Sequence, residues 1–342
     1  MEHKYYAWIG TNSVRGSQGI YTIEIDAGAG SAKVVSTTQI YNTGGLALSE
    51  DQKNLYAASE GMTFDGLAAG GITAFRIRPD GSLEKQNGQP SSGQRTCCVS
   101  VDRAKHYAYG CDFYRGTWNA WPLREDGSLE PAKLCIAPPP GGWQALHCIA
   151  PIDEDFVVVI SLAETAVVVY RTADGARVTS FQFPERAFPR YLAIADHTIY
   201  AMLQGPDLIF VLENHLHEDG TLRHVQTIEV MDEAHRTMPA TSTIRVTPDQ
   251  RLVLAANRPS NSLTIYSRGE DGTLTFEKLV VIPGDGPRDF HISRDGRLVV
   301  VAMQHSNEVV VLKLDYENKT LIQLGTPVHV PSPAAVAVSS EV

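Results

Sequence analysis

The 342-residue sequence lacks the features that suit a nucleic-acid-binding or membrane-spanning chain. Lysine and arginine number 29 against 39 aspartates and glutamates, so the formal net charge is -10. The basic residues form no run or stripe that could neutralise phosphates, which argues against a nucleic-acid partner. No run of 18 apolar residues occurs, and the N-terminal MEHKYYAWIG has no long apolar segment before a cleavage site. We therefore expect a cytoplasmic protein with no membrane partner.

Cysteine is scarce as well, and its spacing excludes the common metal and redox motifs. The chain has five cysteines, none of which form a C-x-x-C pair. The adjacent Cys97 and Cys98 carry no metal signature. We expect reduced thiols with a structural role.

What the sequence does contain is a repeated turn. DGSL occurs at 80–83 and 126–129, DGTL at 219–222 and 271–274, and degenerate copies DGAR and NKTL at 174–177 and 318–321. Consecutive copies are 45 to 52 residues apart. Self-similarity at such a period is typical of repeat architectures. An Asp-Gly pair accommodates the positive φ angles of a tight hairpin, so we interpret the motif as a turn between strands.

Each period divides into four strand-like segments, as in GPRDFHI, RLVVVAM, EVVVLKLDY and LIQLGTPVHV from residue 284 onward. Four strands per period is typical of a propeller blade. The blades fall at roughly 4–43, 44–92, 93–141, 142–186, 187–236, 237–283 and from 284 onward. The tail PAAVAVSS resembles the inner strand that 4–43 lacks. The sequence therefore predicts one all-β domain over 1–342. This domain is a seven-bladed β-propeller of four-stranded antiparallel blades, closed by the C-terminal strand. A solenoid is the weaker alternative, because it would need capping repeats at both ends.

Antiparallel blades bring two sets of loops to one rim of the central channel. The start of each inner strand and the end of the second strand share that rim, and the DGxL turns lie on the opposite one. A concave mouth with convergent polar groups is the default binding site. Our candidates from inner-strand starts are His147, Arg190 and Arg288, and those from second-strand ends and the following loops are Glu60, Asp112, Gln204, Asn257, Arg258, Gln304 and His305. Each of them could instead have only a structural or solvated role.

The segments LVLAANRPSN and GDGPRDFHI resemble the seven-bladed propeller lactonases, the group of bacterial 6-phosphogluconolactonases and fungal carboxymuconate lactonizing enzymes. The blade rhythm that carries the resemblance covers essentially the whole chain. It implies a rim site that contains His147, Arg190 and Arg258, with Arg288 beside them. Where the family commonly has a glutamate after the second strand of the Arg190 blade, this sequence has Gln204, and Asp112 stands where the family has asparagine.

This resemblance implies hydrolysis of a sugar lactone without a metal or other cofactor. His147 is the candidate general base, because an imidazole ordinarily titrates near neutrality. Arg190 and Arg258 would hold the carbonyl oxygen and a substrate carboxylate or phosphate, and Arg288 would add anion binding. Gln204 can position a water but cannot accept its proton. If the family glutamate performs that step, either Asp112 or Glu60 must substitute for it or this protein catalyses a different reaction.

Three alternatives stay open. A divalent metal could be held by Glu60, Asp112 and Asn257, although clustered carboxylates are more usual for such ions. A cycloisomerase acting on an unsaturated diacid would use the same cationic rim, and a binding propeller would need no catalysis at all.

Trp143 is a candidate for the apolar wall against which a sugar ring could pack. The identity of the lactone and the oligomeric state do not follow from the sequence.

Overall fold

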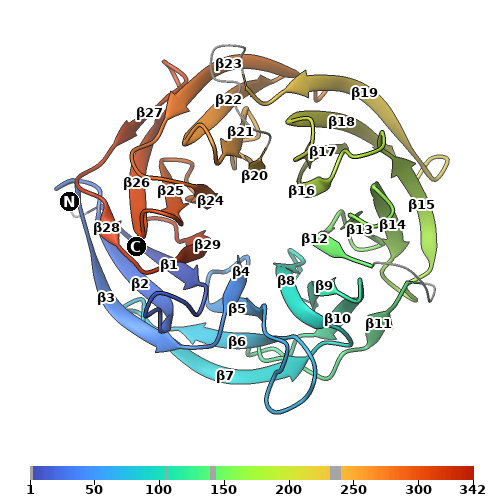
Figure 1. Ribbon diagram of the computed structural model, residues 1–342, viewed down its shortest axis with the longest axis horizontal. Coiled ribbons are helices and arrows are strands. Elements are labelled where there is room, and N and C mark those ends of the chain that lie inside the picture. Colours follow the sequence, from blue (N-terminus) through green and yellow to red (C-terminus); the bar gives the residue numbers. More distant parts are fainter. Residues whose placement is uncertain (1–2, 105, 139–143, 232–239) are drawn as a thin grey trace.

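Seven antiparallel sheets, six of four strands and one whose outer strand is divided into two, surround a central channel (Figure 1). The structure is a computed structural model that describes residues 3–104, 106–138, 144–231 and 240–342. The described residues contain strands and turns but no helix, and therefore no helix that could cross a membrane. The prediction of an all-β, seven-bladed propeller is confirmed.

The strands run from the channel outward in chain order, except in the first sheet. That sheet contains β29 (Pro333–Val338), β1 (Lys4–Thr11), β2 (Gly19–Asp26) and β3 (Ser31–Gln39). The next three contain β4 (Thr43–Leu48), β5 (Asn54–Ser59), β6 (Gly71–Ile77) and β7 (Leu83–Pro90); β8 (Gln94–Val101), β9 (Tyr107–Tyr114), β10 (Trp118–Pro122) and β11 (Leu134–Ile136); and β12 (Leu146–Pro151), β13 (Phe156–Ser161), β14 (Ala166–Arg171) and β15 (Arg177–Gln182). The last three contain β16 (Pro189–Ala195), β17 (Thr198–Leu203), β18 (Leu208–His215) and β19 (Thr221–Glu229); β20 (Thr241–Val246), β21 (Leu252–Asn257), β22 (Ser262–Arg268) and β23 (Leu274–Val281); and β24 (Pro287–Ile292), β25 (Leu298–Met303), β26 (Glu308–Asp315), β27 (Thr320–Gln323) and β28 (Val328–His329).

The ring closes as the sequence predicted. The C-terminal strand β29 pairs antiparallel with β1, with Ala7 opposite Val338 and Ile9 opposite Val336. The two ends of the chain therefore belong to one sheet (Figure 1). The strand β29 is therefore the inner strand of the first blade, and each of the seven sheets contributes one inner strand to the wall of the channel.

The DGxL turns lie on the rear face, opposite the rim that carries the candidate residues. The turn glycines have positive φ, for example +77° at Gly81 and +83° at Gly127. Their carbonyl oxygens also accept hydrogen bonds from aromatic side chains of the preceding blade. Trp8 donates to Gly81 and Tyr56 to Gly127, at 2.9 and 2.8 Å. The repeated turn thus connects neighbouring blades as well as strands.

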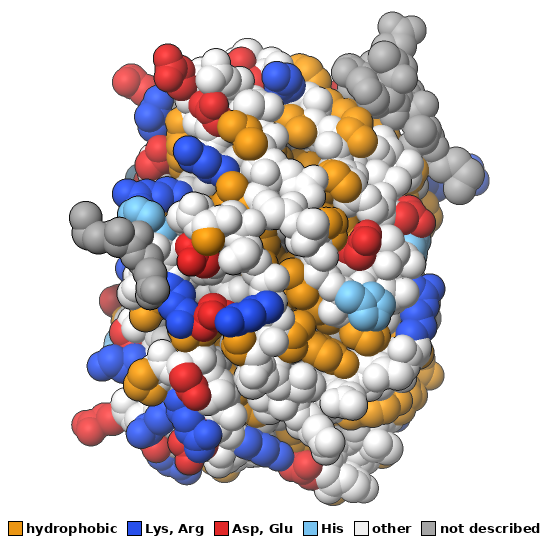
Figure 2. Space-filling view, turned by 90° about the vertical axis from the view of Figure 1, so that its left-hand side faces the viewer, with side chains coloured by type: hydrophobic (Ala, Val, Ile, Leu, Met, Phe, Trp, Pro, Cys, Tyr) orange, Lys and Arg blue, Asp and Glu red, His pale blue; other side chains and the backbone are white. Residues whose placement is uncertain are grey.

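The core lies between blades. The second strands β5, β17, β21 and β25 are buried along their full length, because each sheet is covered on both faces by its neighbours. The outer wall instead mixes charged and apolar side chains, as the side view shows (Figure 2). Exposed valines such as Val34 and Val35 belong to the outer strand β3.

The expected outer strand of the last blade, LIQLGTPVHV, is in two pieces. Both β27 and β28 pair with β26, on either side of a break. Gly325 within the break has a φ of +64°, and Pro327 has no backbone N–H to donate, so the ladder cannot continue through them.

Candidate active site

A β-bulge occurs at the same position of every inner strand. The pairing of each inner strand with its neighbour skips one residue near the start of the strand, or two in β20. The bulge residues are Gly44, Cys97, His147, Arg190, Ser242, Arg288 and Ala334. A bulge re-aims its side chain away from the regular ladder. The fold therefore directs seven equivalent residues, one from each blade, to the mouth of the channel; we call them the bulge ring.

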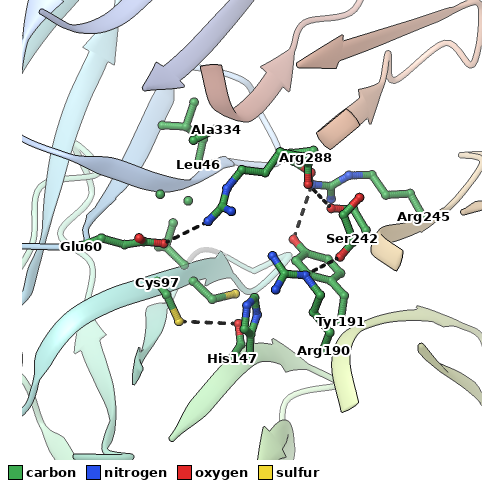
Figure 3. A pocket seen from close by; sticks show the side chains of 16 residues that line it. Leu46, Glu60, Cys97, His147, Arg190, Tyr191, Ser242, Arg245, Arg288 and Ala334 are labelled. Carbon is green, nitrogen blue, oxygen red and sulfur yellow. Dashed lines mark hydrogen bonds and ion pairs between the residues drawn. The ribbon is translucent and has the colours of Figure 1, made fainter. Parts of the chain in front are cut away.

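The bulge ring is chemically uneven. His147, Arg190 and Arg288 are its large polar members, and the other four members are small. All seven line a recess with an open volume of about 470 Å³ (Figure 3). The ionisable side chains around it are Glu60, His147, Arg190, Arg245, Arg288 and Asp289, together with Cys97, Cys98 and Tyr191. The structure thus brings together four residues that the sequence singled out: Glu60, His147, Arg190 and Arg288.

His147 is held in its neutral form. Burial, and then the positive charges of Arg190, Arg288 and Arg258, lower the pKa of His147 well below its usual range. The Nδ1 atom is buried and has no hydrogen-bond partner among the described residues. Protonation of His147 would place a fourth positive charge beside the three arginines in a buried site, where charges are weakly screened.

Arg190 and Arg258 are positioned mostly by neutral acceptors. Arg190 donates from Nε to the carbonyl oxygen of Ser242 at 3.2 Å and from Nη1 to Oε1 of Gln204 at 3.4 Å. Burial, with repulsion from Arg288 and Arg258, lowers the pKa of Arg190 to about 9. Arg258 donates to the carbonyl oxygens of Ala240 and Thr241, at 3.0 and 3.4 Å, so it lies beside the recess and adds its charge from there. Burial and Arg288 lower the pKa of Arg258 as well.

Glu60 is the negative group that faces this cluster. It follows β5 and lies between Arg95 and Arg288, with N···O distances of 3.8 and 4.0 Å. Its side chain is only 11% exposed. Figure 3 shows its carboxylate directed toward Arg288 across the recess.

Asp112 does not reach the recess, contrary to the sequence-based expectation for a rim acid. Its carboxylate is buried in the third blade, where it accepts hydrogen bonds from Ser91 at 2.8 Å, Thr96 at 2.6 Å, Asn119 at 3.2 Å and the hydroxyl of Thr117. Burial raises the pKa of Asp112, and these hydrogen bonds act against that rise. Asp112 therefore has a structural role inside the third blade.

The remaining candidates also lie outside the recess. Asn257 is buried in the sixth blade, where it donates to Ser262 and Thr264 at 3.3 and 3.1 Å. Gln304 and His305 follow β25 at the rim, and their carbonyl oxygens accept hydrogen bonds from Arg15, each at 3.2 Å. Trp143 lies outside the described residues.

A buried ion pair that the sequence reading missed forms the floor of the recess. Nη2 of Arg245 lies 3.1 Å from Oδ1 of Asp289 and 3.5 Å from the hydroxyl of Tyr191. Oδ2 of Asp289 accepts the backbone N–H of Val336 at 2.8 Å. The pair therefore joins the fifth, sixth and seventh blades to the closing strand β29. The available signal in the sequence was Arg245 itself, a charged residue inside the inner strand TSTIRV.

The residues that could hold a metal do not converge on this site. Asp112 and Asn257 lie inside separate blades, so Glu60 has no oxygen ligands from them. Asp153, Asp155 and His217 do bring ligand atoms within 4.8 Å of one another. They lie on exposed turns of the opposite face, and the imidazole of His217 already contacts Asp153 at 2.8 Å. All five cysteines are free, and Sγ of Cys98 lies 4.0 Å from Sγ of Cys148.

A closed ring of seven blades with an arginine-rich, partly enclosed mouth is the architecture of a β-propeller with a candidate site at one end of its channel. The family model for lactonases with a seven-bladed β-propeller matches residues 6–338. The chain therefore belongs to the seven-bladed β-propeller lactonase family.

Individual relatives agree with this assignment. The chain is 27% identical to a 6-phosphogluconolactonase of Bacillus subtilis over 350 residues, which covers 97% of this chain and 98% of the relative. It is 24% identical to a 6-phosphogluconolactonase of Serratia proteamaculans, over 82% of this chain and 83% of that one. The fold matches the structure of a periplasmic gluconolactonase of Pseudomonas aeruginosa with a TM-score of 0.87 at 22% identity, covering 98% and 99% of the two chains.

Proposed function

We propose that the protein hydrolyses a sugar lactone, an aldonolactone that carries an anionic group, in the recess at the channel mouth. The observation that carries the proposal is the convergence of Arg190, Arg288 and His147 from bulges of three different blades on one small recess. The names of the relatives, 6-phosphogluconolactonase and gluconolactonase, agree with an aldonolactone, and the first of them names a lactone that carries an anionic group.

Lactone hydrolysis requires stabilisation of the negative charge that develops on the carbonyl oxygen. Arg190 and Arg288 line the recess, and their guanidinium groups suit such an oxyanion or a phosphate or carboxylate of the substrate. Arg258 adds positive charge from beside the recess. Because Arg190 has a pKa of about 9, it remains charged at neutral pH.

An imidazole with its ordinary pKa would suit His147 to the role of general base. In this recess the pKa of His147 is well below that value, so the ring remains neutral at neutral pH. We propose that it donates a hydrogen bond to the lactone. The proton of the attacking water then goes to another group. The free cysteines suit the cytoplasm as the compartment.

The test is a pH-indicator assay of the purified protein on a panel of aldonolactones, with and without a 6-phosphate. We expect hydrolysis above the spontaneous rate, preference for an anionic lactone, and no loss of rate after treatment with EDTA. Arg288→Ala should abolish the preference for the anion, whereas Arg103→Ala on the opposite face should leave it unchanged. No acceleration on any lactone would overturn the proposal and favour a binding propeller or a cycloisomerase.

A further inference from the structure

The recess has two carboxylates within the described residues, and they differ in what they contact. Asp289 is fully engaged, because one oxygen bonds Arg245 at 3.1 Å and the other accepts the N–H of Val336 at 2.8 Å. Loss of either contact would leave a buried charge or a backbone group without a partner. Asp289 is therefore part of the scaffold and is not free to exchange a proton with a substrate.

Glu60 has the opposite character. Its nearest cations, Arg95 and Arg288, are 3.8 and 4.0 Å away, beyond the distance of a direct hydrogen bond. Among the described residues, no hydrogen-bond donor contacts either of its carboxylate oxygens. The side chain is nevertheless only 11% exposed. A nearly buried carboxylate with free acceptor sites, directed into a recess, is suited to hold a water molecule.

The position of Glu60 depends on the smallest member of the bulge ring. A Cβ atom added at Gly44 would lie 2.2 Å from Oε1 of Glu60, 2.4 Å from its Cδ and 2.6 Å from its Cγ. All three of the nearest atoms belong to Glu60. The glycine of the second blade therefore leaves the space that the carboxylate occupies. That carboxylate lies across the recess from His147 of the fourth blade and Arg190 of the fifth (Figure 3).

We infer that Glu60 is the catalytic carboxylate of this site and that Gly44 is its positioning residue. The inference rests on the proposed lactone hydrolysis. Glu60 takes a proton from a water whose oxygen bonds to the lactone carbonyl carbon. The ring C–O bond then breaks, and the proton passes from Glu60 to the released ring oxygen. The product is a hydroxy acid that ionises in solution, and Glu60 returns to its carboxylate form.

Arg288 and Arg95 have a defined part in this step. Both guanidinium groups lie close to Glu60, and neither forms a direct hydrogen bond that would occupy its oxygens. Gln204, on the side of Arg190, can orient a hydroxyl group of the substrate but accepts no proton. The carboxylate needed for proton transfer thus comes from the second blade, and the fifth blade contributes an amide.

The experiment compares Glu60→Gln with the matched control Glu50→Gln, a glutamate at the opposite end of the channel. On the lactone that the wild-type protein hydrolyses fastest, we expect Glu60→Gln to lower kcat on the order of 100- to 10,000-fold. KM should change by less than about threefold, because the amide keeps the shape of the side chain. The acidic limb of the profile of kcat against pH should disappear. Glu50→Gln should match the wild type.

Gly44→Ala is the second variant, and it retains the carboxylate. We expect it to lower kcat at least about tenfold, because the new methyl group displaces Glu60. Its melting temperature, compared with that of the wild type, separates displacement from unfolding. If Glu60→Gln does not fold, Gly44→Ala decides alone: an unchanged kcat would overturn the assignment.

The inference and the proposed function fail in different ways. A wild-type protein that hydrolyses lactones while Glu60→Gln retains kcat, or loses affinity only, would overturn the role of Glu60 and leave the lactonase proposal intact. A wild-type protein without activity on any lactone would overturn both.

Discussion

The two ends of the channel use similar residues for different purposes. The front recess has an open volume of about 470 Å³ and contains His147 with Arg190 and Arg288. The rear opening has about 1530 Å³ and contains His291 with Arg245 and Arg294, between aliphatic walls. At the rear, Arg294 is bonded directly to Glu50, and Arg245 is bonded to Asp289.

At the front, the charges are not matched in this way. Among the residues that the structure describes, Arg190 has no carboxylate partner, and Arg288 has only the distant Glu60. An arginine with a bonded counter-ion contributes to the fold, whereas one without such a partner can bind a ligand anion. The contacts of Arg190 and Arg288, compared with those of Arg245 and Arg294, therefore mark the front recess as the binding mouth better than the size of the two openings does.

The largest effect, on the free energy of unfolding, is expected at the Arg245–Asp289 ion pair, which lies between the two ends of the channel. Asp289→Ala leaves the charge of Arg245 and the N–H of Val336 without partners. The free energy of unfolding should fall by about 3 to 5 kcal/mol, measured by denaturant unfolding. Arg245→Met combined with Asp289→Leu should recover most of that loss, since no lone charge remains. A single variant as stable as the wild type would contradict the assigned role of the pair.

The next largest effect is on kcat/KM, when an arginine of the front recess is replaced and the result is compared with replacement of an arginine at the rear. Arg190→Ala should lower kcat/KM on the order of 100-fold, because it removes a donor to the developing oxyanion. Arg103→Ala, an exposed residue of the rear opening, should leave kcat/KM unchanged. Equal losses in both variants would eliminate the functional distinction between the two ends.

A third prediction concerns the pH dependence of stability. Burial, with the charge of Arg245, lowers the pKa of His291 to about 3. The unfolded chain binds a proton near pH 6.5, so stability is full above that pH and declines as the pH falls toward 3. Between pH 7 and pH 5 this residue should account for a loss of up to about 2 kcal/mol. His291→Gln should reduce the slope in urea unfolding, and an unchanged slope would show that the imidazole is solvated.

The smallest effect is expected at Gln204. Gln204→Ala removes a neutral acceptor of Arg190 at 3.4 Å, and such a hydrogen bond contributes about 1 kcal/mol. We expect kcat/KM to decrease about fivefold in the lactone assay. A loss as large as that of Arg190→Ala would mean that the amide itself takes part in the reaction.

Much of the architecture could be predicted from the sequence because its signals are local. Asp-Gly turns and alternating apolar residues recur in each blade, and the tail PAAVAVSS has the pattern of the inner strand β29. The topology of an antiparallel blade then places His147, Arg190 and Arg288 on one rim without further information.

What the sequence did not reveal depends on contacts between distant residues. The burial of Asp112 requires Ser91 and Thr117 to meet around it, and the Arg245–Asp289 pair joins strands 44 residues apart in sequence. The pKa of His147 reflects charges from three other blades. A bulge is a property of paired strands and cannot be located in one strand alone.

The bulge ring has a consequence for how such proteins diversify. Each of its members lies outside the paired ladder, so its identity is largely released from the demands of strand pairing. Starting at the second blade, the ring can be written as a seven-letter word, G-C-H-R-S-R-A. One scaffold can then acquire a different chemistry by changing single letters of that word, while the backbone hydrogen bonds between the strands of each blade stay as they are.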